Sequence, residues 1–207
     1  MPRYIMLNKP RGLITACRDE RQRTVMELFP EGEREGLFPV GRLDKDTEGF
    51  LIVTDDGAFC NNVNSPESLV SKTYRFFAKG ELKADTVSRL ESGVDIGSAK
   101  EGLTAPASAV HLATVKARDV LHIFSEGERV RILHTAKGDV PLVEMQITIT
   151  EGKKHQVKKM ALAVGLKIVY LERIAISGVQ LDPTLKRGEY RTLTEDEVAS
   201  ILPKHAK

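Results

Sequence analysis

The segment Leu37-Phe-Pro-Val-Gly-Arg-Leu-Asp-Lys-Asp-Thr-Glu-Gly-Phe-Leu-Ile-Val-Thr54 places a highly charged loop between two apolar runs. Residues 41–49 hold three acids and two bases, and residues 50–54 form the continuous apolar run of a buried strand. Charged groups beside a buried strand are costly unless they pair or take part in chemistry. The segment therefore predicts a loop that is held at both ends and is either a functional site or a solvated hairpin loop.

Strands predominate in the rest of the chain, and helices lie between them without regular alternation. Apolar runs and alternation predict strands at 4–7, 72–78, 120–124, 130–134, 142–150, 167–171 and 174–177. Helical periodicity and capping signals predict helices at 24–29, 58–64, 84–91, 154–164 and 194–202. This pattern favours an α+β fold on a mixed, largely antiparallel sheet with flanking helices. We expect a single domain over residues 1–207, with two subdomains at about 1–65 and 66–207.

Length and composition predict a globular protein. The chain has 207 residues, of which 41% are hydrophobic and 29% charged, a balance that excludes a disordered or fibrous chain. No apolar run approaches the roughly 20 residues of a membrane helix, and no signal peptide precedes the first strand. We therefore expect a cytoplasmic protein without a membrane partner. Cys17 and Cys60 lack metal-binding spacing, so we expect reduced packing residues and no metal site.

The cations are unevenly distributed along the chain. Lys and Arg total 31 against 29 Asp and Glu, a net charge of +2. Residues 1–18 and 152–171 together carry nine of the cations and no acid. If these two stretches meet in the fold, they create a positive field that attracts phosphates. The alternative is two solvated faces that never meet.

A calcium loop is a rival interpretation of the charged segment. Asp44, Asp46, Glu48 and Gly49 fall at positions 1, 3, 5 and 6 of the EF-hand pattern. Position 12 would then be Asp55, where that loop uses a bidentate glutamate. Pro39 and Gly41 also interrupt any incoming helix. These differences argue against calcium.

Three motifs, in this order along the chain, resemble the bacterial ribosomal-RNA pseudouridine synthases of the RsuA type. They are Gly41-Arg-Leu-Asp-Lys-Asp-Thr-Glu-Gly49 followed by Thr54-Asp-Asp-Gly57, Lys72-Thr-Tyr74, and Glu151-Gly-Lys-Lys-His-Gln-Val-Lys-Lys-Met160. Weaker similarities are Leu7-Asn-Lys-Pro10, Leu171-Glu-Arg173 and Gly188-Glu-Tyr-Arg191. The resemblance spans nearly the whole chain. It implies the pseudouridine synthase catalytic fold with a central cleft, and a cofactor-free isomerisation of uridine to pseudouridine.

The resemblance assigns the catalytic roles to three residues. Asp44 matches the catalytic aspartate, which acts either as a nucleophile at ribose C1′ or as the base that removes a sugar proton. Either role needs the ionised carboxylate, so a cation should stabilise it, with Lys158 the first candidate and Lys153 the second. Tyr74 matches a tyrosine that stacks on the detached uracil or assists proton movement; as a strand tyrosine it can also be a core residue.

The resemblance and the charge pattern also indicate residues that contact RNA. Arg42 is expected to fill the gap left by a flipped uridine, its alternative being a salt bridge to Asp46 or Glu48. His155 and Gln156 are expected to shape the entrance near the third motif. The phosphate contacts are expected from Lys9, Arg11, Lys153, Lys154 and Lys159.

The partner implied by the resemblance is ribosomal RNA, 16S or 23S, or a ribosome assembly intermediate, with no obligate protein partner. Related enzymes commonly begin with an S4-type RNA-binding domain, and this sequence is expected to lack one. That feature favours large-subunit members, whereas Gln156-Val-Lys158 favours small-subunit members. Two other functions compete with the enzyme: a non-catalytic RNA-binding or assembly protein, and a carboxylate-dependent glycosidic hydrolase, for which a second acid is missing.

Overall fold

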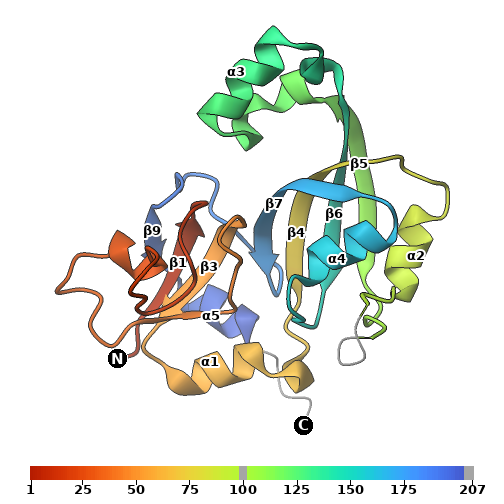
Figure 1. Cartoon of the computed structure of the whole chain (residues 1–207). Coiled ribbons are helices and arrows are strands. Elements are labelled where there is room, and N and C mark those ends of the chain that lie inside the picture. The colour runs from red at the N-terminus through yellow and green to blue at the C-terminus, as the bar shows by residue number, and fades with distance from the viewer. Residues whose placement is uncertain (98–101, 203–207) are drawn as a thin grey trace. The chain divides into compact units, whose positions relative to one another are not determined.

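The computed structural model describes residues 1–97 and 102–202. The chain divides into two compact units. The first comprises Met1–Thr73, Thr150–Gly152 and Glu172–Lys207, and the second comprises Tyr74–Ile149 and Lys153–Leu171. The strands β4 (Lys72–Lys79) and β7 (Lys167–Ile176) each begin in one unit and end in the other (Figure 1).

The sheet of the first unit is built on β3 (Glu48–Thr54), in which every residue is buried. β1 (Tyr4–Lys9) and β2 (Phe38–Val40) pair with β3 in antiparallel fashion. β9 (Tyr190–Thr192) extends the sheet beyond β1, and β8 (Val179–Gln180) pairs with β7. The end of β7 pairs with β3 in parallel, with Glu172 opposite Glu48 and Arg173 opposite Gly49.

Two α-helices cover one face of this sheet. The Asp56 carboxylate caps α1 (Gly57–Asn64) by accepting from the Ala58 and Phe59 N–H groups. Thr194 and Glu197 form the predicted capping box of α5 (Glu195–Ile201). The first unit also contains the short 3₁₀ helices η1 (Val25–Leu28) and η2 (Pro66–Ser68). The core between the helices and the sheet comprises Met6, Val40, Phe50, Ile52, Phe59, Val63, Val70, Ile176, Leu193 and Ile201.

The strands of the second unit follow the order β5-β6-β4-β7, and β7 continues the same sheet to β3. β5 (Ser108–Lys116) and β6 (Pro141–Ile149) are antiparallel, with a shift in register between His111 and Ala113. α2 (Thr86–Ser92) ends at Gly93, and α4 (Gln156–Ala163) follows the third motif. The predicted α+β class and largely antiparallel sheet are confirmed.

The connection between β5 and β6 corrects two predicted strands. Residues 120–123 lie instead in η3 (Ala117–Ile123), whose C-cap is Phe124, and residues 130–134 lie in α3 (Glu126–His134); η4 (Ala136–Asp139) follows. The Glu128 carboxylate accepts from the Ser125 N–H at 3.0 Å and from its hydroxyl at 2.7 Å. This Ser-x-x-Glu signal outweighs the apolar alternation that favoured a strand. Figure 1 shows α3 at one end of the β5/β6 hairpin.

Two further predictions are corrected. The strands predicted at 167–171 and 174–177 are one strand, β7, because carbonyl oxygens satisfy the charged Arg173 side chain within it. Cys17, predicted to pack, is exposed, whereas the half-buried Cys60 lies against the core of the first unit. Burial raises the pKa of the Cys60 thiol.

Candidate active site

Residues 41–47 connect β2 to β3, and their backbone is held by other segments of the first unit. The Thr15 hydroxyl donates to the Leu43 carbonyl at 2.7 Å and accepts from the Leu43 N–H at 3.2 Å. The Gly12 N–H donates to the Lys45 carbonyl at 2.8 Å. Leu43 and Thr47 point inward and are buried. The loop is fixed relative to the sheet, because its carbonyls accept hydrogen bonds from other segments and its apolar side chain is buried.

Lys9 binds the same loop from beneath. Its side chain is fully buried, and its ammonium donates to the carbonyls of Pro10 at 3.0 Å, Thr47 at 2.9 Å and Lys45 at 3.4 Å. Desolvation lowers the pKa of Lys9 to about 8, against the opposing effect of nearby acids that include Glu48. Lys9 was expected to contact RNA phosphates. Its burial corrects that expectation, because an ammonium enclosed by three carbonyls does not face the solvent.

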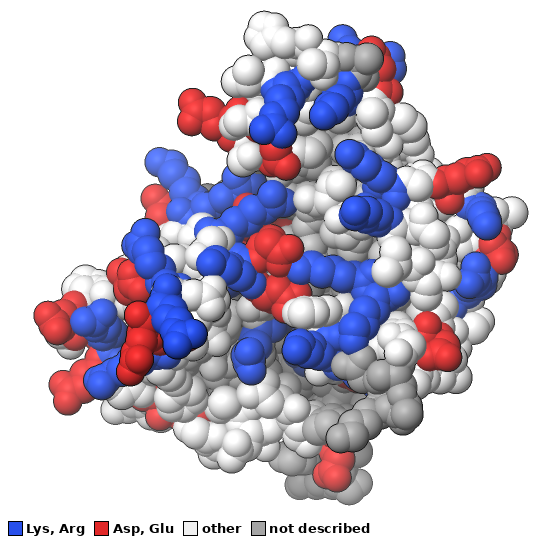
Figure 2. All heavy atoms as spheres, viewed as in Figure 1, with Lys and Arg blue, Asp and Glu red and all other residues white. Residues whose placement is uncertain are grey.

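Glu48 is a second buried charge at the end of the loop. Its carboxylate lies 3.2 Å from Arg11 Nε and 2.6 Å from Arg187 Nε, and its side chain is only 5% exposed. These ion pairs join the loop to residues near both ends of the chain. The salt bridge considered between Arg42 and Glu48 is therefore not the one that forms, and Arg42 is exposed. Figure 2 shows Asp and Glu side chains among Lys and Arg side chains on one face of the molecule.

Asp44 lies at the centre of this fixed loop and is half-buried. Its carbonyl accepts from the Thr47 N–H at 3.1 Å, which closes a tight turn. Its negative charge is among those that raise the pKa of Lys9, so the carboxylate lies within electrostatic range of that buried ammonium. A partly exposed carboxylate on a rigid backbone is suited to act as a base or a nucleophile.

Tyr74 and Lys158 belong to the second unit. Tyr74 lies on β4 with 8% of its surface exposed, so most of its ring is buried, as the core alternative requires. Lys158 lies in the first turn of α4 and is half-buried. Val157, Met160 and Ala161 form the buried stripe of this helix, as the helical spacing predicts.

The residues before α4 are held by a turn at its N-terminus. The buried Gln156 side chain accepts from the Lys153 N–H at 2.8 Å, and the Lys153 ammonium donates to the Leu103 carbonyl at 2.7 Å. His155 has a left-handed conformation, with φ of 54°. Lys154 and His155 are exposed, and Lys159 is half-buried. Gln156 thus organises the turn, and its neighbours form the accessible surface of the third motif.

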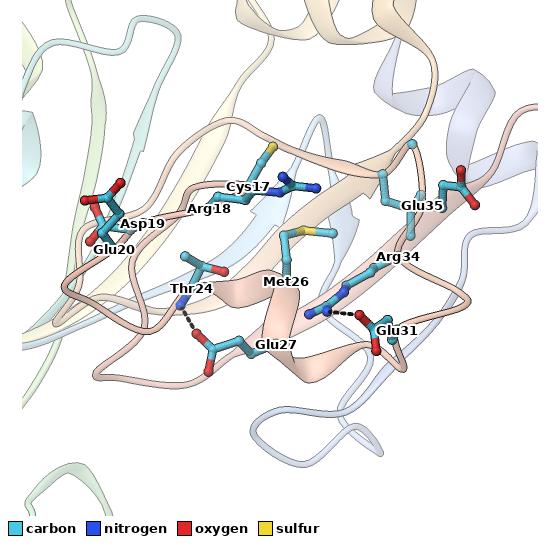
Figure 3. Close-up of a pocket in the computed structure, with 12 residues that line it drawn as sticks. Cys17, Arg18, Asp19, Glu20, Thr24, Met26, Glu27, Glu31, Arg34 and Glu35 are labelled. Atoms are coloured by element: carbon cyan, nitrogen blue, oxygen red, sulfur yellow. Dashed lines mark hydrogen bonds and ion pairs between the residues drawn. The ribbon is translucent and has the colours of Figure 1, made fainter.

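A hollow of about 1120 Å³ in the first unit lies beside η1 and the loop that follows it. Figure 3 shows Arg18, Asp19 and Glu20 at one end and the Arg34–Glu31 ion pair at the other. Five acids and two arginines line it, which disfavours an RNA backbone. Within residues 1–97 and 102–202, no group of three His, Cys, Asp or Glu side chains is arranged to hold a metal ion.

Sequence reasoning missed the residues that support the loop. Thr15 carried no motif signal, and Arg173 was noted only in the weak similarity Leu171-Glu-Arg173. Arg173 is nevertheless 1% exposed and donates to the carbonyls of Phe50 and Gly41. The charged pair Glu172-Arg173 between two apolar runs was the signal that could have identified it.

The fold and the three motifs on it define an enzyme that acts on RNA. A family model described as RNA pseudouridylate synthase matches residues 3–163. The uncharacterized RNA pseudouridine synthase YtzG of Bacillus subtilis is 43% identical over 196 residues, which cover 94% of this chain and 71% of the relative. The ribosomal small subunit pseudouridine synthase A of Vibrio cholerae is 38% identical over 200 residues, covering 97% of this chain and 74% of that relative.

A solved structure gives the same result. A pseudouridylate synthase crystal structure superposes with a TM-score of 0.78 at 30% identity, covering 98% of this chain and 74% of that chain. The chain belongs to the RNA pseudouridylate synthase family. It is an isomerase that converts uridine in RNA to pseudouridine, and the predicted family and fold are confirmed. No helix in the described residues is long and apolar enough to cross a membrane.

Proposed function

We propose that Asp44 is the catalytic group of this synthase. In the reaction, the N1–C1′ bond of uridine breaks, the uracil turns, C5 bonds to C1′, and the proton on C5 leaves while N1 gains one. The observation that carries the assignment is the loop itself. Its backbone is held by Thr15, Lys9 and Arg173, while the Asp44 side chain remains partly exposed. Such support fixes a carboxylate for attack or proton removal at the ribose.

The roles of Tyr74 and Lys158 are part of the same proposal. Both lie in the second and third motifs that characterise the resemblance. The resemblance gives the Tyr74 ring the role of a flat surface for the detached uracil, through the small part of it that is exposed, and its hydroxyl the role of assisting movement of the C5 proton. Lys158, with Lys153 the second candidate, is the cation that we propose for the role the resemblance gives to a basic residue of the third motif; the Lys153 ammonium already binds the Leu103 carbonyl.

The RNA contacts that we propose are exposed or half-buried cations. Arg42 stands next to Leu43 on the Asp44 loop and is accessible to occupy the space of a flipped uridine. Lys154 and His155 are exposed before α4, and Lys159 is half-buried on it. These groups supply affinity for phosphates and little discrimination between sequences.

The substrate that we propose is ribosomal RNA, and the small-subunit 16S RNA is the first choice. The names of two relatives support it: the proteins from Vibrio cholerae and Escherichia coli, 38% and 35% identical to this chain, are ribosomal small subunit pseudouridine synthases. The large-subunit 23S RNA and an assembly intermediate are the other candidates. Modification of ribosomal RNA would place the protein in the cytoplasm.

The test uses wild-type protein and Asp44→Asn with unmodified 16S and 23S RNA in separate reactions. Pseudouridines are mapped at single-nucleotide resolution, and RNA binding is measured in parallel. We expect a site in 16S RNA that Asp44→Asn forms at least about 1,000-fold more slowly, with RNA affinity within a few fold. Asp196→Asn, which alters an exposed acid in the first turn of α5, is the matched control and should retain full activity.

The other outcomes separate the alternatives. Full activity of Asp44→Asn would exclude Asp44 as the catalytic group. Binding without modification of either RNA by the wild-type protein would favour the non-catalytic assembly protein, and the same assay on assembly intermediates would then decide. An Asp44-dependent site in 23S RNA alone would support the catalytic role of Asp44 and show that the substrate is 23S RNA and not 16S RNA.

A further inference from the structure

Arg173 is a buried cation outside the three motifs. It lies on β7, and only 1% of its surface is exposed. Its Nε donates to the Phe50 carbonyl at 2.7 Å, and its Nη2 donates to the Gly41 carbonyl at 2.6 Å. A buried guanidinium is costly unless it is well bonded, so its retention in the centre of a sheet needs an explanation.

The two carbonyls that Arg173 binds lie at the two ends of the Asp44 loop. Gly41 directly follows β2, and Phe50 is the third residue of β3. β2 and β3 are antiparallel at this point, with Val40 opposite Ile52. The planar guanidinium therefore spans the base of the loop, using donors whose fixed geometry suits two separate acceptors.

The backbone of Arg173 approaches the same loop closely. Arg173 lies opposite Gly49 in the parallel pairing of β7 with β3. Gly49 has φ of +99°, and a Cβ at this position would lie 2.3 Å from the Arg173 carbonyl oxygen. Gly41 has φ of +68°, and a Cβ at this position would lie 3.6 Å from the Arg173 guanidinium. Both glycines therefore allow β7 to hold the loop through backbone and side chain together.

Electrostatics agree with this geometry. The charge of Arg173 contributes to lowering the pKa of Lys9 and the pKa of Lys72, after burial, which is the larger cause for both. The positive potential of Arg173 therefore reaches the interior beneath the loop, where Lys9 also experiences the charge of Asp44.

We infer that Arg173 is a positioning residue, which fixes the base of the Asp44 loop so that the carboxylate meets the ribose at the reactive distance. This inference rests on the proposed function of Asp44. Arg173 acts through the Gly41 and Phe50 carbonyls. Loss of the two-point contact lets the loop shift, and a displacement of about 1 Å at a reacting group costs about 100-fold in rate.

The test is Arg173→Lys, which keeps the charge but replaces the planar fork with a single ammonium. Single-turnover rates are measured with saturating enzyme, together with the dissociation constant for RNA and amide exchange over residues 41–50. We expect a rate constant about 10–100-fold lower, an affinity within threefold, and faster exchange in that loop. Arg191→Lys is the matched control, since Arg191 pairs with Asp182 and Glu197 away from the loop; its rate should stay within twofold.

Three results decide the inference. A merely structural role for Arg173 would reduce the reaction amplitude, which follows the folded fraction, and leave the rate constant within twofold of wild type; this overturns the inference. Inactivity of the wild-type protein would instead refute the proposed function. If Arg173→Lys does not fold, Gly41→Ala is the second variant, because it disturbs the Gly41 carbonyl that accepts from Arg173 and leaves Arg173 in place. An unchanged rate constant in Gly41→Ala overturns the inference.

Discussion

Two connections between antiparallel strands are built in opposite ways. The β2/β3 connection, residues 41–47, has little regular structure and is held by Lys9, Thr15 and Arg173 from other parts of the first unit. The β5/β6 connection, residues 117–140, contains η3, α3 and η4 and supplies its own capping hydrogen bonds, although its buried side chains pack against Phe77, Leu142 and Tyr170 of the sheet. Its Arg129 donates to carbonyls of the same connection, those of Leu121 and Phe124, both at 2.9 Å.

The two connections differ in which residues determine their conformation, residues within the connection or residues distant in the sequence. A helix satisfies its own backbone, so the conformation of α3 follows from local signals; its buried Ile132 packs on the sheet, and most of its other residues are exposed. Val130 and Leu133 on α3 are 54% and 59% exposed. The Asp44 loop cannot satisfy its own carbonyls and takes its shape from residues up to 132 positions away. Positioning of a catalytic group to within fractions of an ångström is achieved by that second kind of construction.

The same substitution, Gly→Ala, should therefore have opposite effects at Gly49 of β3, where β7 approaches the end of the Asp44 loop, and in the β5/β6 connection. The largest effect is expected at Gly49, where a Cβ would lie 2.3 Å from the Arg173 carbonyl and φ is +99°. We expect Gly49→Ala to lower the free energy of unfolding by more than about 3 kcal/mol, or to prevent folding, because the clash involves backbone. Urea denaturation measures this change.

Gly57→Ala is the control in the same unit. Gly57 is the first residue of α1, and a Cβ there would contact nothing within 4 Å. It should be neutral or slightly stabilising. Equal losses at Gly49 and Gly57 would show that the close approach of β7 does not decide the cost, and the contrast between the two connections would lose its physical basis.

The contrast also explains how far sequence reasoning reached. The α+β class, the framed loop and the cap at Thr194 follow from local patterns, and these predictions are confirmed. Asp44 was identified by its motif, but the residues that hold its loop were not, because Thr15 and Arg173 act across the sheet. Lys9 was misplaced for the same reason, since nothing local distinguishes a lysine that faces RNA from one that binds buried carbonyls.

The α3 error has the opposite origin. Residues 120–124 and 130–134 show apolar alternation, which was interpreted as strand, although Ser125 and Glu128 form a capping box between them. Both signals were local and present in the sequence. Capping chemistry therefore deserves more weight than short alternation when the two conflict. The roles of Tyr74 and Lys158 remain predictions from the motifs.

Lys9 provides a smaller test of the buried loop support. Its pKa is lowered to about 8, below the ordinary value near 10.5 of an unfolded chain. Below pH 8 the Lys9 amine is protonated in both the folded and the unfolded protein, and burial of its charge destabilises the folded state. Between pH 8 and 10.5 the unfolded state binds more protons, so the stability of the wild type should rise relative to Lys9→Met, by about 1–3 kcal/mol.

The measurement is the difference in unfolding free energy between wild type and Lys9→Met at several pH values from 7 to 10.5. Lys72, whose pKa burial also lowers to about 8, titrates in both proteins and cancels in this difference. A difference that stays constant over the whole range would show that the Lys9 ammonium is not desolvated, and that the loop is not closed over it.

The smallest effect is expected in the β5/β6 connection, at Gly127. This residue lies in the first turn of α3, its φ is not left-handed, and a Cβ there would contact nothing within 4 Å. Gly127→Ala should raise the free energy of unfolding by about 0.4–1 kcal/mol, because alanine loses less backbone entropy than glycine on helix formation. Pseudouridine formation by this variant should match wild type. A loss of stability would mean that the exposed first turn of α3 depends on contacts outside its own connection, as the Asp44 loop does.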